Sequence, residues 1–109
     1  LVVRVLVNLI SNALKYSPTG SHVLVQAVVH SDNMVAVRVV DKGSGIPKEW
    51  TDKVFDKFAQ VSVRKQGIAI GSGLGLTFCR LAIEAHGGRI WLTSEIGQGT
   101  VVTFTLPKD

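Results

Sequence analysis

Residues 71–88 read GSGLGLTFCRLAIEAHGG and combine alternating glycines, an apolar helical pattern and a double-glycine stop. Apolar residues recur at helical spacing from Leu74 to His86, and Gly87-Gly88 follows, as glycine commonly follows a helix C-terminus. The free N–H groups and the positive dipole end of such a helix attract a phosphate. The stretch therefore predicts a helix whose glycine-rich entrance binds a phosphate group.

The chain before this stretch predicts another long helix and a hairpin. Apolar residues recur at helical spacing over residues 2–14, and SPTG at 17–20 stops the pattern, so we expect a helix ending near Tyr16. Residues 22–30 and 34–40 are rich in valine and flank the turn sequence Ser-Asp-Asn. This pattern favours an antiparallel hairpin.

The remaining segments complete the predicted fold. Residues 48–58 favour a short helix, whereas residues 59–73 have no sustained period. A second hairpin is expected from residues 89–94 and 100–106, which Pro107 closes. Hairpins give antiparallel pairs that need cover on one side only. We therefore predict an α/β (α+β) fold, a two-layer sandwich in which helices cover one face of a mixed, largely antiparallel sheet.

The composition limits the classes of protein to which this chain can belong. The 109 residues fit one domain, and 46% hydrophobic against 18% charged residues allows a packed core. The lone Cys79 excludes an internal disulfide, so we assign it to helix packing. No apolar run reaches the ~18 residues that span a bilayer. The chain opens at Leu1 inside a helical pattern, so we expect it to be a piece of a longer protein.

The net charge of +4 suits a polyanionic ligand, either a nucleotide or a nucleic acid. Basic residues are scattered from Arg4 to Lys108, and only 6% of residues are aromatic. A nucleic-acid surface usually needs clustered positive charge with aromatic residues between. We therefore expect no nucleic-acid partner.

One polar stripe on the first helix has the chemistry of a metal and phosphate site. Asn8, Asn12, Lys15 and Tyr16 follow one another at spacings of four, three and one residues, which places them along one side of a helix. Amide oxygens are suitable ligands for Mg²⁺, and phosphates and water complete the coordination shell of the ion. A lysine can neutralise phosphate charge. The alternative is an ordinary solvated helix face.

The segment DKGSGIP at residues 41–47 follows an apolar strand and places a carboxylate beside two glycines. A buried Asp41 would accept a hydrogen bond from the amino group of adenine, whereas guanine presents an acceptor there. The alternative is that Asp41 only forms a turn, a common use of aspartate before glycine.

A dinucleotide-binding oxidoreductase is a competing interpretation of the glycines. Glu95 lies about twenty residues after them, as that fingerprint requires. However, Leu76 occupies the position of the third glycine, and too few strands follow to build a parallel sheet. This interpretation is therefore disfavoured.

Four segments in order resemble the conserved boxes of the histidine-kinase branch of the GHKL ATP-binding superfamily. They are NLISNALKY (8–16) as the N box, DKGSG (41–45) as the first glycine box, FDKF (55–58) as the F box and GSGLGL (71–76) as the second glycine box. The closing stretch, with HGGRI (86–90), Ser94-Glu95, Gly99-Thr100 and Leu106-Pro107, is similar to the usual ending of kinase members.

The resemblance implies a Bergerat-type fold and a set of site residues. It places Mg²⁺ on Asn12 and Asn8, phosphate on Lys15, and adenine on Tyr16 and Asp41. It also implies further ATP contacts, and a lid over ATP at about residues 59–73. These contacts are an adenine pocket shaped by Gly43 and Gly45, a phosphate loop with Gly71, Gly73 and Gly75, and Arg64 in the lid. The further expected cofactor-binding residues are Ile46, Ser72, Leu74, Leu76 and Thr100.

The resemblance also implies a mechanism. ATP-hydrolysing relatives typically carry a glutamate four residues before the metal asparagine, where this chain has Asn8. A neutral imidazole already offers a lone pair, so a histidine acceptor needs no such base. The implied function is transfer of the γ-phosphoryl group of Mg-ATP to a histidine on a separate dimerisation domain, with Asn12 and Lys15 as the catalytic residues.

The implied partners are that dimerisation domain of the same protein and the receiver domain of a response regulator, in the cytoplasm and without direct membrane contact by this domain. The resemblance leaves open whether the parent protein is anchored in a membrane. Gln60 and Ile70 depart from the family pattern, which has arginine and glycine there in many members. This departure leaves open the alternative of a nucleotide-binding regulatory module that transfers nothing.

Overall fold

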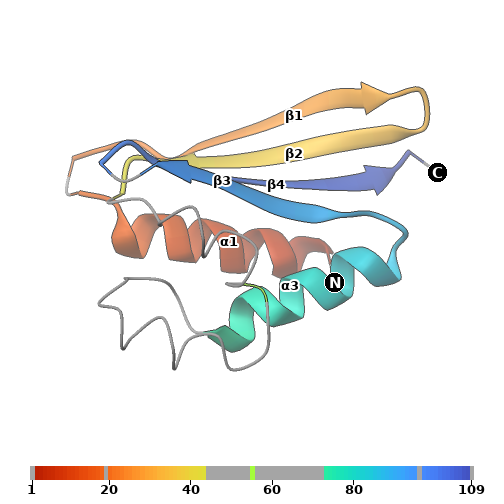
Figure 1. The fold of residues 1–109 in the computed structure, drawn as a ribbon, viewed down its shortest axis with the longest axis horizontal. Coiled ribbons are helices and arrows are strands. Elements are labelled where there is room, and N and C mark those ends of the chain that lie inside the picture. Colours follow the sequence, from red (N-terminus) through yellow and green to blue (C-terminus); the bar gives the residue numbers. More distant parts are fainter. Residues whose placement is uncertain (1, 19, 44–54, 56–72, 96, 109) are drawn as a thin grey trace.

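The computed structural model describes residues 2–18, 20–43, 55, 73–95 and 97–108. Within them the sheet forms one layer and the helices form the other (Figure 1). Neither helix of this described part is long and apolar enough to cross a membrane. The predicted two-layer α+β sandwich is confirmed. Its elements are the helices α1 (Val2–Tyr16) and α3 (Gly73–Ala85) and the strands β1 (Leu24–Ser31), β2 (Met34–Asp41), β3 (Ile90–Glu95) and β4 (Gly99–Pro107).

The predicted element boundaries agree closely with the structure. Helix α1 ends at Tyr16 as expected, and α3 begins at Gly73, one residue before the predicted start. Strand β1 begins at Leu24, slightly later than predicted. The predicted helix at 48–58 and the predicted lid lie outside the described residues, except for Phe55, which is buried, and Gly73.

The sheet has the strand order β1-β2-β4-β3, and all its pairings within the described residues are antiparallel. The strand β4 therefore lies between β2 and β3. Thr100 pairs with Asp41 on one side and with Ser94 on the other. This register brings three polar residues, which are far apart in sequence, into one row at the end of the sheet.

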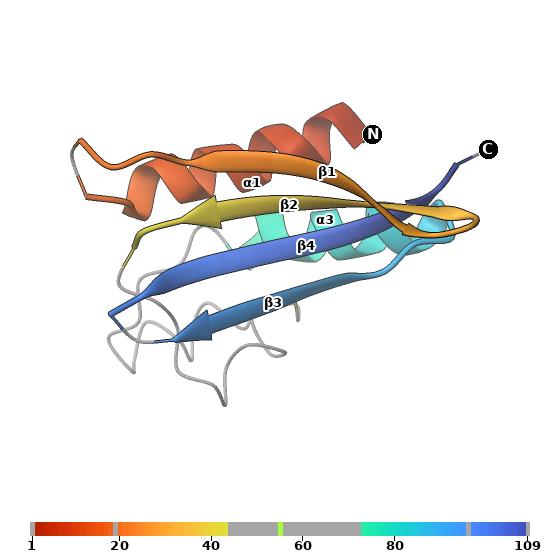
Figure 2. The ribbon, with the colours of Figure 1, turned by 90° about the horizontal axis from the view of Figure 1, so that it is seen from above.

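The core lies between the sheet and the two helices, which run side by side on one face (Figures 1 and 2). Each helix buries a stripe of small and branched residues, which fits their helical spacing. Removing a large side chain of this kind from water contributes about 1.5–3 kcal/mol. The fully buried side chains come from all the layers: Val5 of α1, Ile83 and Cys79 of α3, Val39 of β2 and Phe104 of β4.

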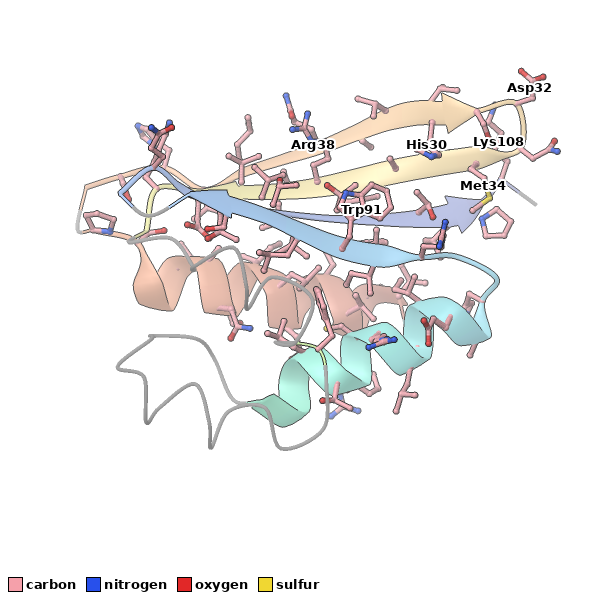
Figure 3. The ribbon with its side chains drawn as sticks, viewed as in Figure 1. His30, Asp32, Met34, Arg38, Trp91 and Lys108 are labelled. Carbon is pink, nitrogen blue, oxygen red and sulfur yellow. The ribbon has the colours of Figure 1, made fainter. Side chains whose placement is uncertain are left out.

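The opposite face of the sheet carries no helix among the described residues, and two rings provide cover there instead. Trp91 of β3 and the exposed His30 of β1 pack with ring centroids 6.1 Å apart (Figure 3). Trp91 pairs with Thr103 across the strands. Thr103 and Thr105 alternate with core residues of β4 and are nevertheless buried. Thr103 thus lies beside Trp91, whereas the Thr105 hydroxyl accepts from the backbone N–H of Arg89 at 3.1 Å.

Helix α3 ends in a motif that fixes the path into β3. Gly87 adopts a left-handed φ of 84°. The N–H of Gly88 donates to the carbonyl oxygen of Ile83 at 3.0 Å, and that of Gly87 donates to Glu84 at 3.0 Å. This is the paired bonding of a Schellman cap. A side chain at Gly88 would overlap the carbonyl of Thr105, so only glycine lets the cap lie against β4.

Gly88→Ala is therefore expected to lower the free energy of unfolding by more than about 2 kcal/mol, since backbone atoms would have to move. The matched control is Gly20→Ala, where φ is 87° but a Cβ meets open space. It should cost only about 1 kcal/mol. Urea unfolding followed by tryptophan fluorescence measures both, and equal costs would contradict the close approach of α3 and β4.

Candidate nucleotide-binding site

Three chain segments that carry predicted site residues end on the same side of the molecule. The C-terminal end of α1, the end of β2 and the N-terminal end of α3 lie together in Figure 1. The backbone of Lys15 and Tyr16 continues α1, but their side chains lie outside what is described. Gly45, Ile46, Arg64, Gly71 and Ser72 also lie outside the described residues.

The amide residues of α1 lie near its contact with α3. Asn8 and Asn12 are one turn apart, and both are partly buried. The Cys79 thiol of α3 lies 3.8 Å from the carbonyl oxygen of Val5. Burial raises the pKa of Cys79 to about 11, and a hydrogen bond from the Asn8 side chain acts in the opposite direction. Cys79 packs between the helices as predicted, and Asn8 contacts it there.

The phosphate-loop residues begin α3. Gly73 is the first residue of the helix, so the N–H groups of its first turn have no earlier helical carbonyl to bond. The first turn contains no acidic residue that would repel a phosphate. Leu76 is buried in the core, so its side chain anchors this end of α3 against the sheet. The side chain of Leu74 is not described.

Asp41 ends β2 and folds back on its own loop. The Gly43 amide donates to its carboxylate at 2.8 Å, and the backbone N–H of Thr100 donates to it from β4. Partial burial raises the pKa of Asp41 above its ordinary value, while these two hydrogen bonds act to lower it. The turn interpretation is correct for the Gly43 bond. A carboxylate accepts about four hydrogen bonds, so capacity remains for a ligand.

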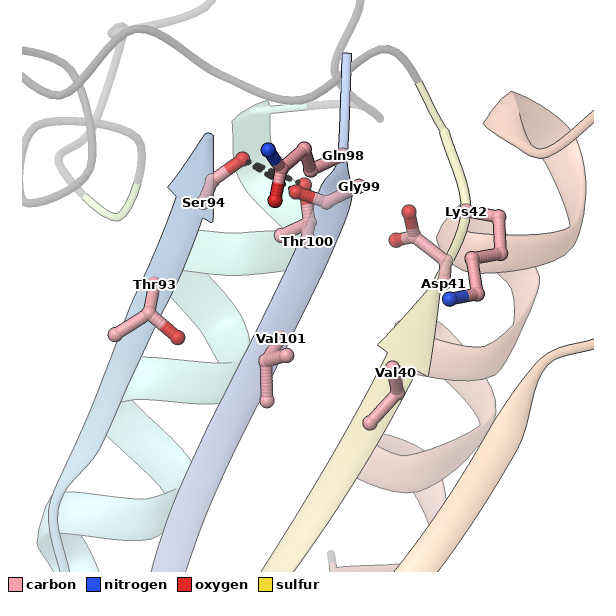
Figure 4. Close-up of a pocket in the computed structure, with 9 residues that line it drawn as sticks. All are labelled: Val40, Asp41, Lys42, Thr93, Ser94, Gln98, Gly99, Thr100 and Val101. Atoms are coloured by element: carbon pink, nitrogen blue, oxygen red, sulfur yellow. Dashed lines mark hydrogen bonds between the residues drawn. The ribbon is translucent and has the colours of Figure 1, made fainter. Parts of the chain in front are cut away.

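Hydroxyl groups extend the polar row from Asp41 across β4 to β3 (Figure 4). The Ser94 hydroxyl donates to the carbonyl oxygen of Gly99 at 2.9 Å and lies 3.0 Å from the Thr100 hydroxyl. Gly99 has a φ of 97°, and a Cβ there would overlap the backbone of Asp41. Glycine at this position lets Thr100 approach Asp41 closely.

A hollow of about 270 Å³ lies at these strand ends. Asp41, Ser94 and Thr100 line it together with Val40 and Val101, which alternate with core residues. The hollow therefore extends to the face of the sheet that carries no helix. The hollow is one part of the polar region at this end of the sheet, and its lining alone does not define a pocket for a nucleotide base.

Sequence reasoning named Ser94 only as part of the closing pattern and gave it no role. Its contact depends on the register between β3 and β4, which pairs Ser94 with Thr100. The sequence feature that could have indicated a role for Ser94 is its position, as a small hydroxyl residue, directly before a glycine-rich turn. The turn length that sets the register is not readable from residue types alone.

A two-layer α+β sandwich that brings a strand-end carboxylate and a helix N-terminus to one side has the arrangement of a nucleotide-binding domain. The family described as histidine kinase-, DNA gyrase B-, and HSP90-like ATPase matches residues 1–109. The chain belongs to this family.

Relatives with curated names include sensor kinases. Sensor histidine kinase WalK of Bacillus subtilis is 46% identical over 107 residues, which are 97% of this chain and 18% of that protein. Adaptive-response sensory kinase SasA of Synechococcus elongatus is 38% identical over 104 residues, 95% of this chain and 26% of that protein. The chain thus spans about a fifth to a quarter of these relatives.

Solved structures of histidine kinases are similar to this chain in fold. The full-length ShkA in complex with AMPPNP has a TM-score of 0.80 at 29% identity and covers 95% of this chain and 20% of that one. Mycobacterial sensor histidine kinase MprB has a TM-score of 0.81 at 29% identity, with 95% and 68% covered. The catalytic domain of histidine kinase ThkA has a TM-score of 0.76 at 31% identity, with 96% and 64% covered. The predicted resemblance is confirmed, and the oxidoreductase interpretation is excluded.

Asp41→Asn is expected to stabilise the folded domain at neutral pH. Because burial raises the folded-state pKa of Asp41, wild-type stability falls as pH rises from its ordinary pKa of about 4 through the folded value. The asparagine oxygen still accepts from Gly43 but never ionises. Thermal unfolding at pH 4 to 8 should show the variant gaining on wild type as pH rises. A variant that loses ground as pH rises would mean that the ionised carboxylate stabilises the fold.

Proposed function

We propose that this domain binds Mg-ATP and donates its γ-phosphoryl group to a histidine on a dimerisation domain of the same protein. The observation that carries the proposal is the shared end of the fold, where Asp41 and the N-terminus of α3 lie on one side. Membership of the ATPase family over the whole chain and the names of the sensor-kinase relatives support it.

Adenine recognition is assigned to Asp41. Its partly buried carboxylate is held in place by two backbone N–H groups and has acceptor capacity left. The 6-amino group of adenine donates to such an acceptor, whereas the 6-oxo group of guanine would face it with a second acceptor. Gly43 and Gly45 let the base approach the backbone, and Tyr16, Ile46 and Thr100 complete the pocket in this proposal.

Phosphate is assigned to Lys15, the entrance of α3 and its glycines, with Arg64 of the lid at the γ-phosphate. Helix α1 carries no carboxylate, so its possible metal ligands are the neutral amide oxygens of Asn8 and Asn12. These fit Mg²⁺, which takes few protein oxygens and completes its shell with phosphates and water. Asn12 is the principal ligand in this proposal, and Asn8 remains a second candidate, since donating its amide N–H to Cys79 leaves its amide oxygen available. Bound Mg²⁺ would supply neutralisation of triphosphate charge.

Transfer then needs positioning more than acid–base chemistry. The unprotonated imidazole nitrogen of the acceptor forms a bond to the γ-phosphorus, and the electron pair of the broken P–O bond leaves on ADP. The proton on the other ring nitrogen is released to solvent. Lys15 and the N-terminus of α3 stabilise the phosphoryl charge, and Asn8 stands where a base for water would otherwise be.

The partners in this proposal are the histidine-bearing dimerisation domain and a receiver domain that takes the phosphoryl group onward. Both belong to the cytoplasmic side of signalling, where ATP is available. This domain makes no membrane contact of its own in the proposal, whether or not the parent protein is anchored.

Asn12→Ala should lower transfer at least about a hundredfold, because a misplaced triphosphate loses the alignment that transfer requires. The assay mixes the domain with the dimerisation domain of its parent and follows label from the γ-phosphate of ATP onto histidine. Ser11→Ala, an exposed position on the same helix, is the matched control and should retain full transfer.

Two results would contradict the proposal. Tight ATP binding by wild type without label on histidine would favour a regulatory module that transfers nothing, in line with Gln60 and Ile70. Full transfer by Asn12→Ala would show that the amide is not part of the phosphate site.

A further inference from the structure

A hydrogen-bonded link joins the two helices at Cys79 of α3. The helices run side by side under the sheet (Figure 1), and both Cys79 and Val5 of α1 are fully buried. The Cys79 thiol donates to the carbonyl oxygen of Val5 at 3.8 Å, a long and weak bond of the kind that sulfur makes. The side chain of Asn8, three residues further along α1, makes a second hydrogen bond to the same sulfur. Cys79 therefore holds α1 through one backbone group and one side chain.

The direction of both bonds follows from the groups involved. A thiol carries one proton, and a cysteine buried among apolar groups keeps it at neutral pH. A carbonyl oxygen only accepts, so the thiol proton is directed at Val5. The sulfur is then an acceptor toward Asn8, whose amide donates through its nitrogen. Because nitrogen and oxygen lie on opposite sides of the amide carbon, the oxygen of Asn8 is turned away from the sulfur.

We propose that Cys79 is a positioning residue for the metal site, because it holds the Asn8 amide with its oxygen free for Mg²⁺. This inference rests on the proposed function, in which Asn8 is a candidate ligand beside Asn12. An amide without a fixed partner can rotate about its last torsion and present its N–H groups, which repel a cation. Groups that orient a metal ligand in this way commonly affect the affinity for the metal.

The place of Cys79 in α3 gives the link a second consequence. The same helix begins at Gly73, where the proposed function assigns the phosphates. A ligand of the metal on α1 is therefore tied to the helix that receives the phosphates. A buried cysteine that only fills space would support the packing of α1 on α3 and would affect nucleotide binding with or without metal. Positioning instead affects only the contribution of the metal.

The experiment is calorimetric titration of the domain with ADP, once with Mg²⁺ and once with EDTA. The ratio of the two affinities measures the contribution of the metal. Cys79→Ala should lower this ratio about three- to tenfold, the effect of one hydrogen bond. Cys79→Ser keeps a group that both donates and accepts, and it should retain the ratio. Ile83→Val, which trims another fully buried side chain of α3, is the matched control and should leave the ratio unchanged.

Nuclear magnetic resonance of the domain without metal or nucleotide detects the link directly. The side-chain amide protons of Asn8 should exchange slowly with water in wild type and in Cys79→Ser. They should exchange faster in Cys79→Ala, where the nitrogen has lost its acceptor. Unchanged exchange in Cys79→Ala would overturn the inference, since the sulfur would then not hold the amide.

A double variant tests whether Cys79 acts through Asn8. In the background Asn8→Ala, adding Cys79→Ala should change the ratio no further. A further fall there, or an equal loss of ADP affinity with Mg²⁺ and with EDTA in Cys79→Ala alone, would overturn the inference while leaving nucleotide binding in place. Failure of wild type to bind ADP, or to bind it more tightly with Mg²⁺, would instead overturn the proposed function.

Discussion

Burial of Val5, Ile83 and Phe104 between α1, α3 and the sheet is the interaction on which the rest of the structure depends. These side chains come from three separate segments, so none of the segments can bury its apolar face alone. Packing both helices on one face brings the end of α1, the end of β2 and the start of α3 to one side. The polar residues of the site need no core of their own, because they stand where these elements end.

At this end of the fold, the sheet and the helices carry polar groups of different chemistry. Ionisable Asp41 lies at the sheet, where burial raises its pKa and two backbone N–H groups hold its carboxylate. Neutral amides lie on α1, and the first turn of α3 has N–H groups with no earlier helical carbonyl to bond and contains no acidic residue. In the proposed site the triphosphate would lie at these helix groups, while the base would meet the acceptor at Asp41. A protein with this division can align ATP for an external nucleophile without supplying a base.

Much of this arrangement was predictable from the residues. The apolar period of residues 2–16 and the Gly87-Gly88 stop identified both helices, and turn residues identified both hairpins, because these signals are local. The exposure of β1 was not predictable. Its valines suggest a half-buried strand, yet the strand is exposed along its length, because it lies at the sheet edge and neither described helix packs closely against it. The Ser94–Thr100 contact and the bond from Asn8 to Cys79 depend on strand register and helix packing, which residue types do not specify.

The central claim is that this end of the sheet selects adenine through Asp41. The most direct measurement is calorimetric titration of the wild-type domain and of Asp41→Asn with Mg-ADP, and in parallel with Mg-GDP and NAD. The account predicts saturable binding of Mg-ADP by wild type, no detectable binding of the other two, and loss of ADP binding in the variant. Equal binding of GDP, or ADP binding unaffected by the substitution, would contradict it.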